Sequence, residues 1–156
     1  PTVILEPRRV YELESLDFPQ WDQPDLYFVT FGDVVIDAAH AAYELEKRGI
    51  KAQVFPIEDV TIMEMPNGNV PTVVTDTGHL FCGATAEAVA RLVEAGNNKI
   101  KRVGPPFVPL PTSVELEREW YPGVNDLLKA ASQLLDLPED FQDKVTVGED
   151  TFKGPF

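Results

Sequence analysis

Apolar residues between about residues 26 and 137 form short runs that alternate with stretches of helical spacing. The short runs are bounded by glycine, proline and asparagine, as buried strands commonly are. We predict strands at residues 26–31, 51–57, 70–75 and 99–103, and helices at residues 34–48, 83–95 and 125–135. Alternating strands and helices favour a mainly parallel sheet with helices on both faces. The expected fold class is therefore α/β, with three αβα layers.

Local signals set several of the expected boundaries. Asp33 is placed to cap the helix that begins at residue 34, because a carboxylate accepts hydrogen bonds from the free backbone N–H groups of a first turn. Gly49 is the natural residue just past that helix, with Lys47 and Arg48 in its last turn. Pro56 cannot donate a ladder hydrogen bond, so the second strand is expected to end near it.

The chain divides into three segments. Residues 1–25 hold an apolar strand followed by a proline-rich linker, in which Phe18 and Trp21 are expected to lie against apolar surface. Residues 26–137 form the domain itself, and residues 138–156 form an acidic tail whose aromatic residues suggest that it docks. A length of 156 residues is that of a single domain.

Charge and composition exclude several classes of partner. The formal net charge is −13, from 13 Lys and Arg against 26 Asp and Glu, which disfavours nucleic acid and anionic membranes. An acidic surface for a basic partner stays open. No apolar run is long enough to span a bilayer and no secretory signal is visible. The single cysteine, Cys82, cannot form an internal disulfide, so a reduced, cytoplasmic protein is expected.

Few residues suggest chemistry. His79 and Cys82 stand three positions apart before a helix, where a thiolate is stabilised by backbone N–H groups, so Cys82 is a candidate reactive thiol. A buried, inert cysteine is the simpler interpretation. Two histidines and one cysteine are too few for zinc, and His40 is interpreted as an ordinary helix-face residue. Gly32 lacks the further glycines of a dinucleotide site, so no cofactor-binding or metal-binding residue is assigned.

Two further features are weighed for surface roles. Glu115, Glu117 and Glu119 alternate along the segment ELERE and are expected to form one solvated side of it. Trp120 and Tyr121 precede a proline and are candidate interface residues, since such aromatics are enriched at protein–protein contacts. A packing anchor is the alternative role for this pair.

Five stretches, in order, resemble one family. They are PTVILEPRRVY at residues 1–11, ELEKRGIKAQVFPI at 44–57, CGATAE at 82–87, KRVGPP at 101–106 and YPGVND at 121–126. Together they resemble the transketolase C-terminal-like domain, as found in the C-terminal part of 2-oxoacid dehydrogenase E1 β subunits. The chain departs from the family where MEMPNGN replaces a crossover helix, and where only His79 remains of an H-E-x-H motif.

The resemblance implies an accessory role. The family's thiamine diphosphate and Mg²⁺ lie between two other domains, and this chain has no G-D-G…N-N signature. It therefore implies a domain or subunit that binds no cofactor alone, and joins subunits carrying the thiamine diphosphate in a homo- or hetero-oligomer. In the family this domain serves assembly and the active-site entrance, where His79 is the candidate residue.

Two other hypotheses stay open. A stand-alone binding or regulatory module has kept the fold and lost catalysis, as the missing crossover helix and the tail would suggest. An independent enzyme instead uses Cys82 and His79. A reactive thiol near neutral pH would support the enzyme, and an inert one would exclude it.

Overall fold

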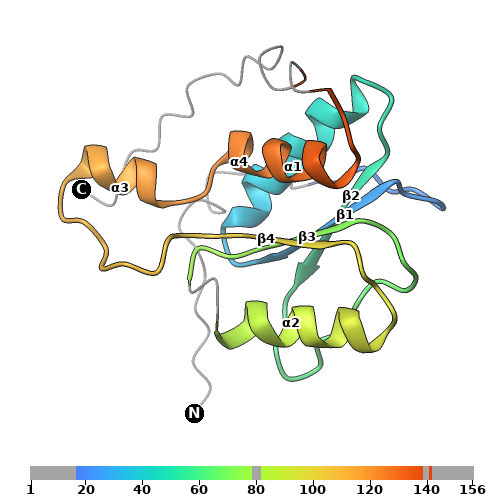
Figure 1. Cartoon of the computed structure of the whole chain (residues 1–156), viewed down its shortest axis with the longest axis horizontal. Helices are drawn as coiled ribbons and strands as arrows, with labels where there is room; N and C mark the ends of the chain where they lie inside the picture. The colour runs from blue at the N-terminus through green and yellow to red at the C-terminus, as the bar shows by residue number, and fades with distance from the viewer. Residues whose placement is uncertain (1–16, 79–81, 139–140, 142–156) are drawn as a thin grey trace.

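A four-stranded parallel sheet forms the centre of the computed structural model, which describes residues 17–78, 82–138 and 141 (Figure 1). The strand order is β2-β1-β3-β4, so the two central strands are β1 and β3. The elements are β1 (Leu26–Phe31), α1 (Val34–Glu46), β2 (Ala52–Ile57), β3 (Thr72–Thr75), α2 (Gly83–Glu94), β4 (Ile100–Val103), α3 (Val114–Trp120) and α4 (Val124–Leu134). The α/β class and the four predicted strands are confirmed.

The helices cover the two faces of the sheet unequally. Figure 1 shows α1 and α4 together on one face and α2 on the other, which gives the expected three layers. The face under α1 and α4 buries the larger core, which includes Leu26, Phe28, Leu45, Leu127 and Leu128 at 1% exposure or less. Side chains of successive strand residues point to opposite faces, so Val29 and Phe31 belong to the smaller core under α2.

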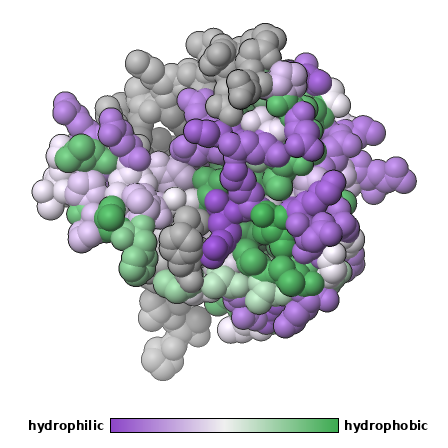
Figure 2. Space-filling view, viewed as in Figure 1, coloured by the Kyte–Doolittle hydropathy of each residue, from purple (hydrophilic) through white to green (hydrophobic). Residues whose placement is uncertain are grey.

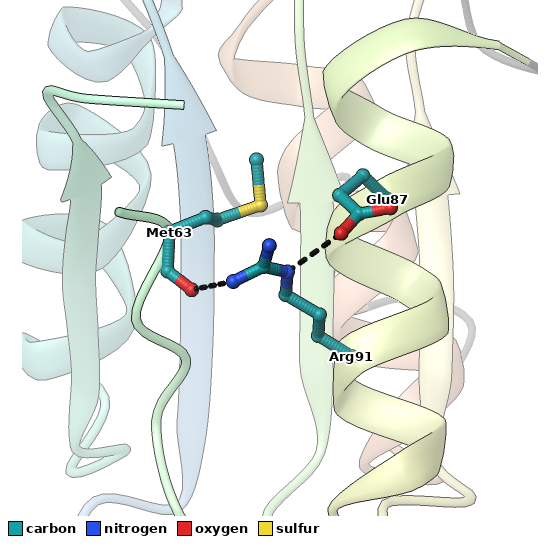
Figure 3. Close-up of polar contacts among 3 residues, drawn as sticks. All are labelled: Met63, Glu87 and Arg91. Carbon is teal, nitrogen blue, oxygen red and sulfur yellow. Dashed lines mark hydrogen bonds and ion pairs between the residues drawn. The ribbon is translucent and has the colours of Figure 1, made fainter. Parts of the chain in front are cut away.

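The connection from β2 to β3 contains no helix, as the sequence predicts. Residues 58–71 instead run back across the α2 face as an irregular segment, and Met63 from this segment is buried in the smaller core. Arg91 on α2 holds the segment in place (Figure 3). Its Nη1 donates to the carbonyl oxygen of Met63 at 2.7 Å, while its Nε pairs with Glu87 at 2.7 Å.

Both flanks of the domain pack on the larger core. Phe18 lies against it, which confirms the expectation for that residue. Phe141 also lies against it, and Arg48 donates to the Phe141 carbonyl oxygen at 2.5 Å and stacks 4.4 Å from its ring centroid. Trp21 is half-buried, with Lys51 Nζ 5.8 Å from its ring centroid, and it is not among the residues packed on either core. The other predictions for the ends of the chain fall at residues 1–16, 139–140 and 142–156, outside the described residues.

Helix boundaries depart from the predictions in two places. The segment that alternates Glu115, Glu117 and Glu119 forms α3, so the expected single solvated side is wrong. In a helix, positions two apart face different directions, and Glu117 is accordingly less exposed than the other two. Gly49 is confirmed beyond α1, with φ of 79° and the Ile50 N–H bonded to the Leu45 carbonyl. Lys47 and Arg48, expected in the last turn, lie past its end.

Candidate functional site

The helices that follow the neighbouring strands β1 and β3 lie on opposite faces of the sheet. Along the chain, β1 is followed by α1 on one face of the sheet, and β3 is followed by α2 on the other. In open parallel sheets such a reversal opens a crevice at the carboxyl ends of the strands, where ligands and partners commonly bind. We call this region, built around Thr30, Asp33, Thr75, Thr77 and Tyr121, the carboxyl edge.

Asp33 and Thr77 connect the two loops across the carboxyl edge. The Thr77 hydroxyl donates to Asp33 Oδ1 at 3.4 Å. The predicted cap is wrong, because Asp33 makes no side-chain capping hydrogen bond to α1. Its backbone is already helical, with φ −76° and ψ −17°, whereas a capping residue is normally extended so that its side chain reaches back to the first turn.

Two threonine hydroxyls lie buried below this bridge. Thr30 and Thr75 are register partners at the carboxyl ends of β1 and β3, with 1% and 0% exposure. Neither hydroxyl has a hydrogen-bond partner within the described chain. Burying a hydroxyl without a partner costs about 1–3 kcal/mol. By contrast Thr72, at the start of β3, donates to the Val70 carbonyl at 2.8 Å and accepts from Asn97 Nδ2 at 3.0 Å.

Tyr121 joins the carboxyl edge from the end of α3. Burial raises the pKa of its phenol above the ordinary value of 10.0, and the nearby negative charges of Glu117 and Asp33 raise it further. The phenol therefore stays protonated at neutral pH and is available as a hydrogen-bond donor. Trp120 packs edge-on against Tyr121, with centroids 4.9 Å apart, and its indole Nε1 is buried with no partner among the described residues.

The structure places one member of the predicted Cys82–His79 pair. Cys82 is exposed and precedes the first residue of α2 with an extended backbone, and its carbonyl accepts from the Thr85 hydroxyl at 3.5 Å. His79 falls in residues 79–81, outside the described residues, so the pair stays a prediction. His40 is exposed on α1.

The described part of the chain holds neither a cluster of metal-ligating side chains nor a membrane-spanning helix. No group of three His, Cys, Asp or Glu side chains that could hold a metal ion occurs within residues 17–78, 82–138 and 141. Among the same residues, no helix has the length and apolar character needed to cross a bilayer.

Sequence comparison decides the family. A family model described as the C-terminal domain of transketolase matches residues 19–127. The chain belongs to the transketolase C-terminal domain family. The match covers β1 to the first turns of α4, and therefore includes the whole carboxyl edge.

Curated relatives carry this domain as part of longer chains. The β subunit of the mitochondrial pyruvate dehydrogenase E1 component of Pisum sativum is 27% identical over 159 residues, covering 85% of this chain and 44% of its own length. The corresponding Bacillus subtilis subunit is 26% identical over 160 residues, covering 88% and 49%. The β subunit of acetoin:2,6-dichlorophenolindophenol oxidoreductase of Cupriavidus necator is 25% identical over 158 residues, covering 86% and 46%. The chain thus spans less than half the length of these relatives.

A solved structure agrees on the fold. It is a split-gene transketolase described as an inactive β4 tetramer, with a TM-score of 0.56 and 23% identity. The likeness covers 72% of this chain and 40% of that one. The predicted transketolase C-terminal-domain-like architecture is therefore confirmed.

Proposed function

We propose that this chain is the accessory C-terminal domain or subunit of a thiamine-diphosphate-dependent enzyme resembling transketolase or a 2-oxoacid dehydrogenase. It contributes subunit contacts and part of the substrate entrance, and it is not catalytic alone. The observation that carries this proposal is the family match over residues 19–127 in a chain that spans under half of its relatives. The part of the relatives that this chain does not cover would hold the cofactor-binding domains.

The donor and acceptor groups at the carboxyl edge do not fit thiamine diphosphate itself. A diphosphate needs free N–H groups or cations, whereas Asp33 places a carboxylate at the start of α1. The cofactor and its Mg²⁺ therefore belong on the partner domains, and this chain supplies polar groups that face them. The Tyr121 phenol is a group of this kind.

We assign the predicted residues to this role. His79 belongs to the substrate entrance, and Trp120 and Tyr121 belong to the contact with the partner subunit. Both aromatic residues are half-buried, so part of each ring is still exposed. A partner subunit would cover this exposed aromatic surface. The compartment proposed is the cytoplasm, where the Cys82 thiol stays reduced.

Native mass spectrometry of the protein isolated gently from its source tests the proposal. We expect a stoichiometric partner chain whose sequence carries the G-D-G…N-N thiamine signature. A 17.3 kDa monomer, or a homodimer without that partner, would overturn it. Replacing Trp120 with alanine in the assembled complex is the matched variant. Trp120→Ala should weaken association of the subunits. Val60→Ala is the control, because Val60 is an exposed apolar residue on the segment after β2, and this variant should leave association unchanged.

A stand-alone binding or regulatory module is the second candidate. The helix-free connection at residues 58–71 favours it, because the family's usual crossover helix is absent there. This candidate expects a well-behaved monomer with no thiamine-dependent partner, so the same mass spectrum separates the two. An independent enzyme based on Cys82 would instead require a thiol that reacts rapidly near pH 7.

A further inference from the structure

A hollow lies between β4 and α4, next to the carboxyl edge, with which it shares Tyr121. Its volume is about 380 Å³, and residues 120–122 close one end of it. β4 stands at the end of the strand order β2-β1-β3-β4 within the described chain, so one side of the hollow is a sheet edge. Figure 2, in the view of Figure 1, shows a strip of hydrophilic side chains that crosses from α4 over β4 beside an apolar patch.

The hollow gathers positive charge in an acidic protein. Lys101 and Arg102 from β4 and Lys129 from α4 line it, although acidic residues outnumber basic ones by 26 to 13 along the whole chain. Elsewhere in the described chain, Lys47 and Arg91 pair with glutamates. Lys101 and Lys129 make no such pair among the described residues. Lys101 and Lys129 line the same hollow, so an anion held there would offset the repulsion between their ammonium groups.

Other polar groups also line the hollow. Asp126 contributes a carboxylate that keeps its negative charge, although its Oδ2 accepts from the Gly123 backbone N–H at 3.0 Å. Trp120 also lines it, and its buried indole N–H has no acceptor in the described part of the chain. An indole N–H can only donate, so an acceptor that binds in the hollow should change its environment. Glu119 is exposed, and with Asp126 it sets two negative charges against the three positive ones, which leaves the lining with a formal charge of 3 − 2 = +1.

We propose that this hollow binds a small oxyanion, either a phosphate or a carboxylate group, between Lys101 and Lys129. Both lysines act as point-charge donors to its oxygens, which is the contact lysine commonly makes with phosphate. Arg102 contributes further positive potential. Glu119 and Asp126 weaken the site by repulsion. Trp120 and Tyr121 border both this site and the proposed subunit contact.

Titration of the full chain at constant ionic strength tests the proposal. The probes are sodium phosphate and sodium succinate, followed by the two tryptophan indole N–H signals in ¹H–¹⁵N NMR spectra. We expect one probe to saturate and to shift the Trp120 signal more than the Trp21 signal. Saturation by phosphate or by succinate tells which oxyanion the site takes. A linear, unsaturated response to both probes overturns the proposal.

Variants that remove a positive or a negative charge from the hollow should change the affinity for the anion in opposite directions. Lys101→Gln and Lys129→Gln should each weaken binding roughly tenfold, as expected for loss of a charged hydrogen bond. Glu119→Gln should tighten it. Lys99→Gln is the matched control, since Lys99 is exposed beside β4 and does not line the hollow. Equal affinities for the Lys99, Lys101 and Lys129 variants would overturn the proposal.

Discussion

The two faces of the sheet are built from the same strands but stabilised in different ways. On one face α1 and α4 bury a large, continuous core. On the other, α2 shares its face with a helix-free segment that contributes Met63 and depends on Arg91 for its position. The difference teaches how this fold accommodates the absence of a helix. An irregular segment covers the face instead, held by a hydrogen bond from a side chain to its backbone, and this face buries a smaller apolar core. Stability should therefore be unevenly divided between the faces.

The largest expected effect is a cavity on the α1 and α4 face. Leu127→Ala, at a position with 0% exposure, should lower the free energy of unfolding by about 3 kcal/mol. Urea unfolding followed by circular dichroism measures it. The exposed Leu116→Ala variant is the control and should change stability little. A loss below about 1 kcal/mol at Leu127 would contradict the unequal division of the core.

A smaller loss is expected where Arg91 holds the helix-free segment. Arg91→Met should cost about 1–2 kcal/mol, because the Met63 carbonyl loses its donor. Limited proteolysis should then cut residues 58–69 faster. Glu87→Gln is the control, since it removes the exposed ion pair but keeps the bond to Met63. Equal protease sensitivity in the two variants would show that the segment does not depend on this bond.

Between the faces, the threonines of β1 and β3 should respond in opposite directions. Thr30→Val and Thr75→Val should leave stability unchanged or raise it by about 1 kcal/mol, because each removes a buried hydroxyl without a partner. Thr72→Val should lower it by about 1 kcal/mol, because its hydroxyl makes two hydrogen bonds. Thermal unfolding compares the three variants. Similar losses in all three would mean that the carboxyl-edge hydroxyls are satisfied.

The smallest effect is alkaline and involves Tyr121. Its pKa is higher in the folded chain than in the unfolded chain, so the stabilisation it gives is present below pH 10 and is lost as the pH rises through the folded value. Tyr121→Phe should therefore flatten the fall in stability above pH 10. The difference between the ultraviolet titrations of the unchanged chain and of Tyr121→Phe should be centred above pH 10. A difference centred at pH 10 would place Tyr121 in ordinary solvent.

Much of the fold was predictable because its pattern is strong. The run LYFVTF is a strand at the predicted residues 26–31, and the turn sequence around Gly68 correctly indicated a missing helix. The helix α3 was not predictable from alternating charges, since Glu115, Glu117 and Glu119 have the period of a strand. The carboxyl edge was missed because Thr30 and Thr75 are common strand residues. Their one signal is that neighbouring strands each carry a threonine near the carboxyl end.

The helix-free segment also offers a place for attachment. It begins at the carboxyl end of β2 and returns to the amino end of β3, where Asn69 Oδ1 accepts from the Asn98 backbone N–H. The turn before β3 exposes Asn67 and Gly68, at the end of the sheet opposite Asp33 and Tyr121. A fluorophore, affinity tag or fused domain placed at Asn67 would therefore leave the carboxyl edge clear. Partner capture can then be carried out with the proposed contact surface unobstructed.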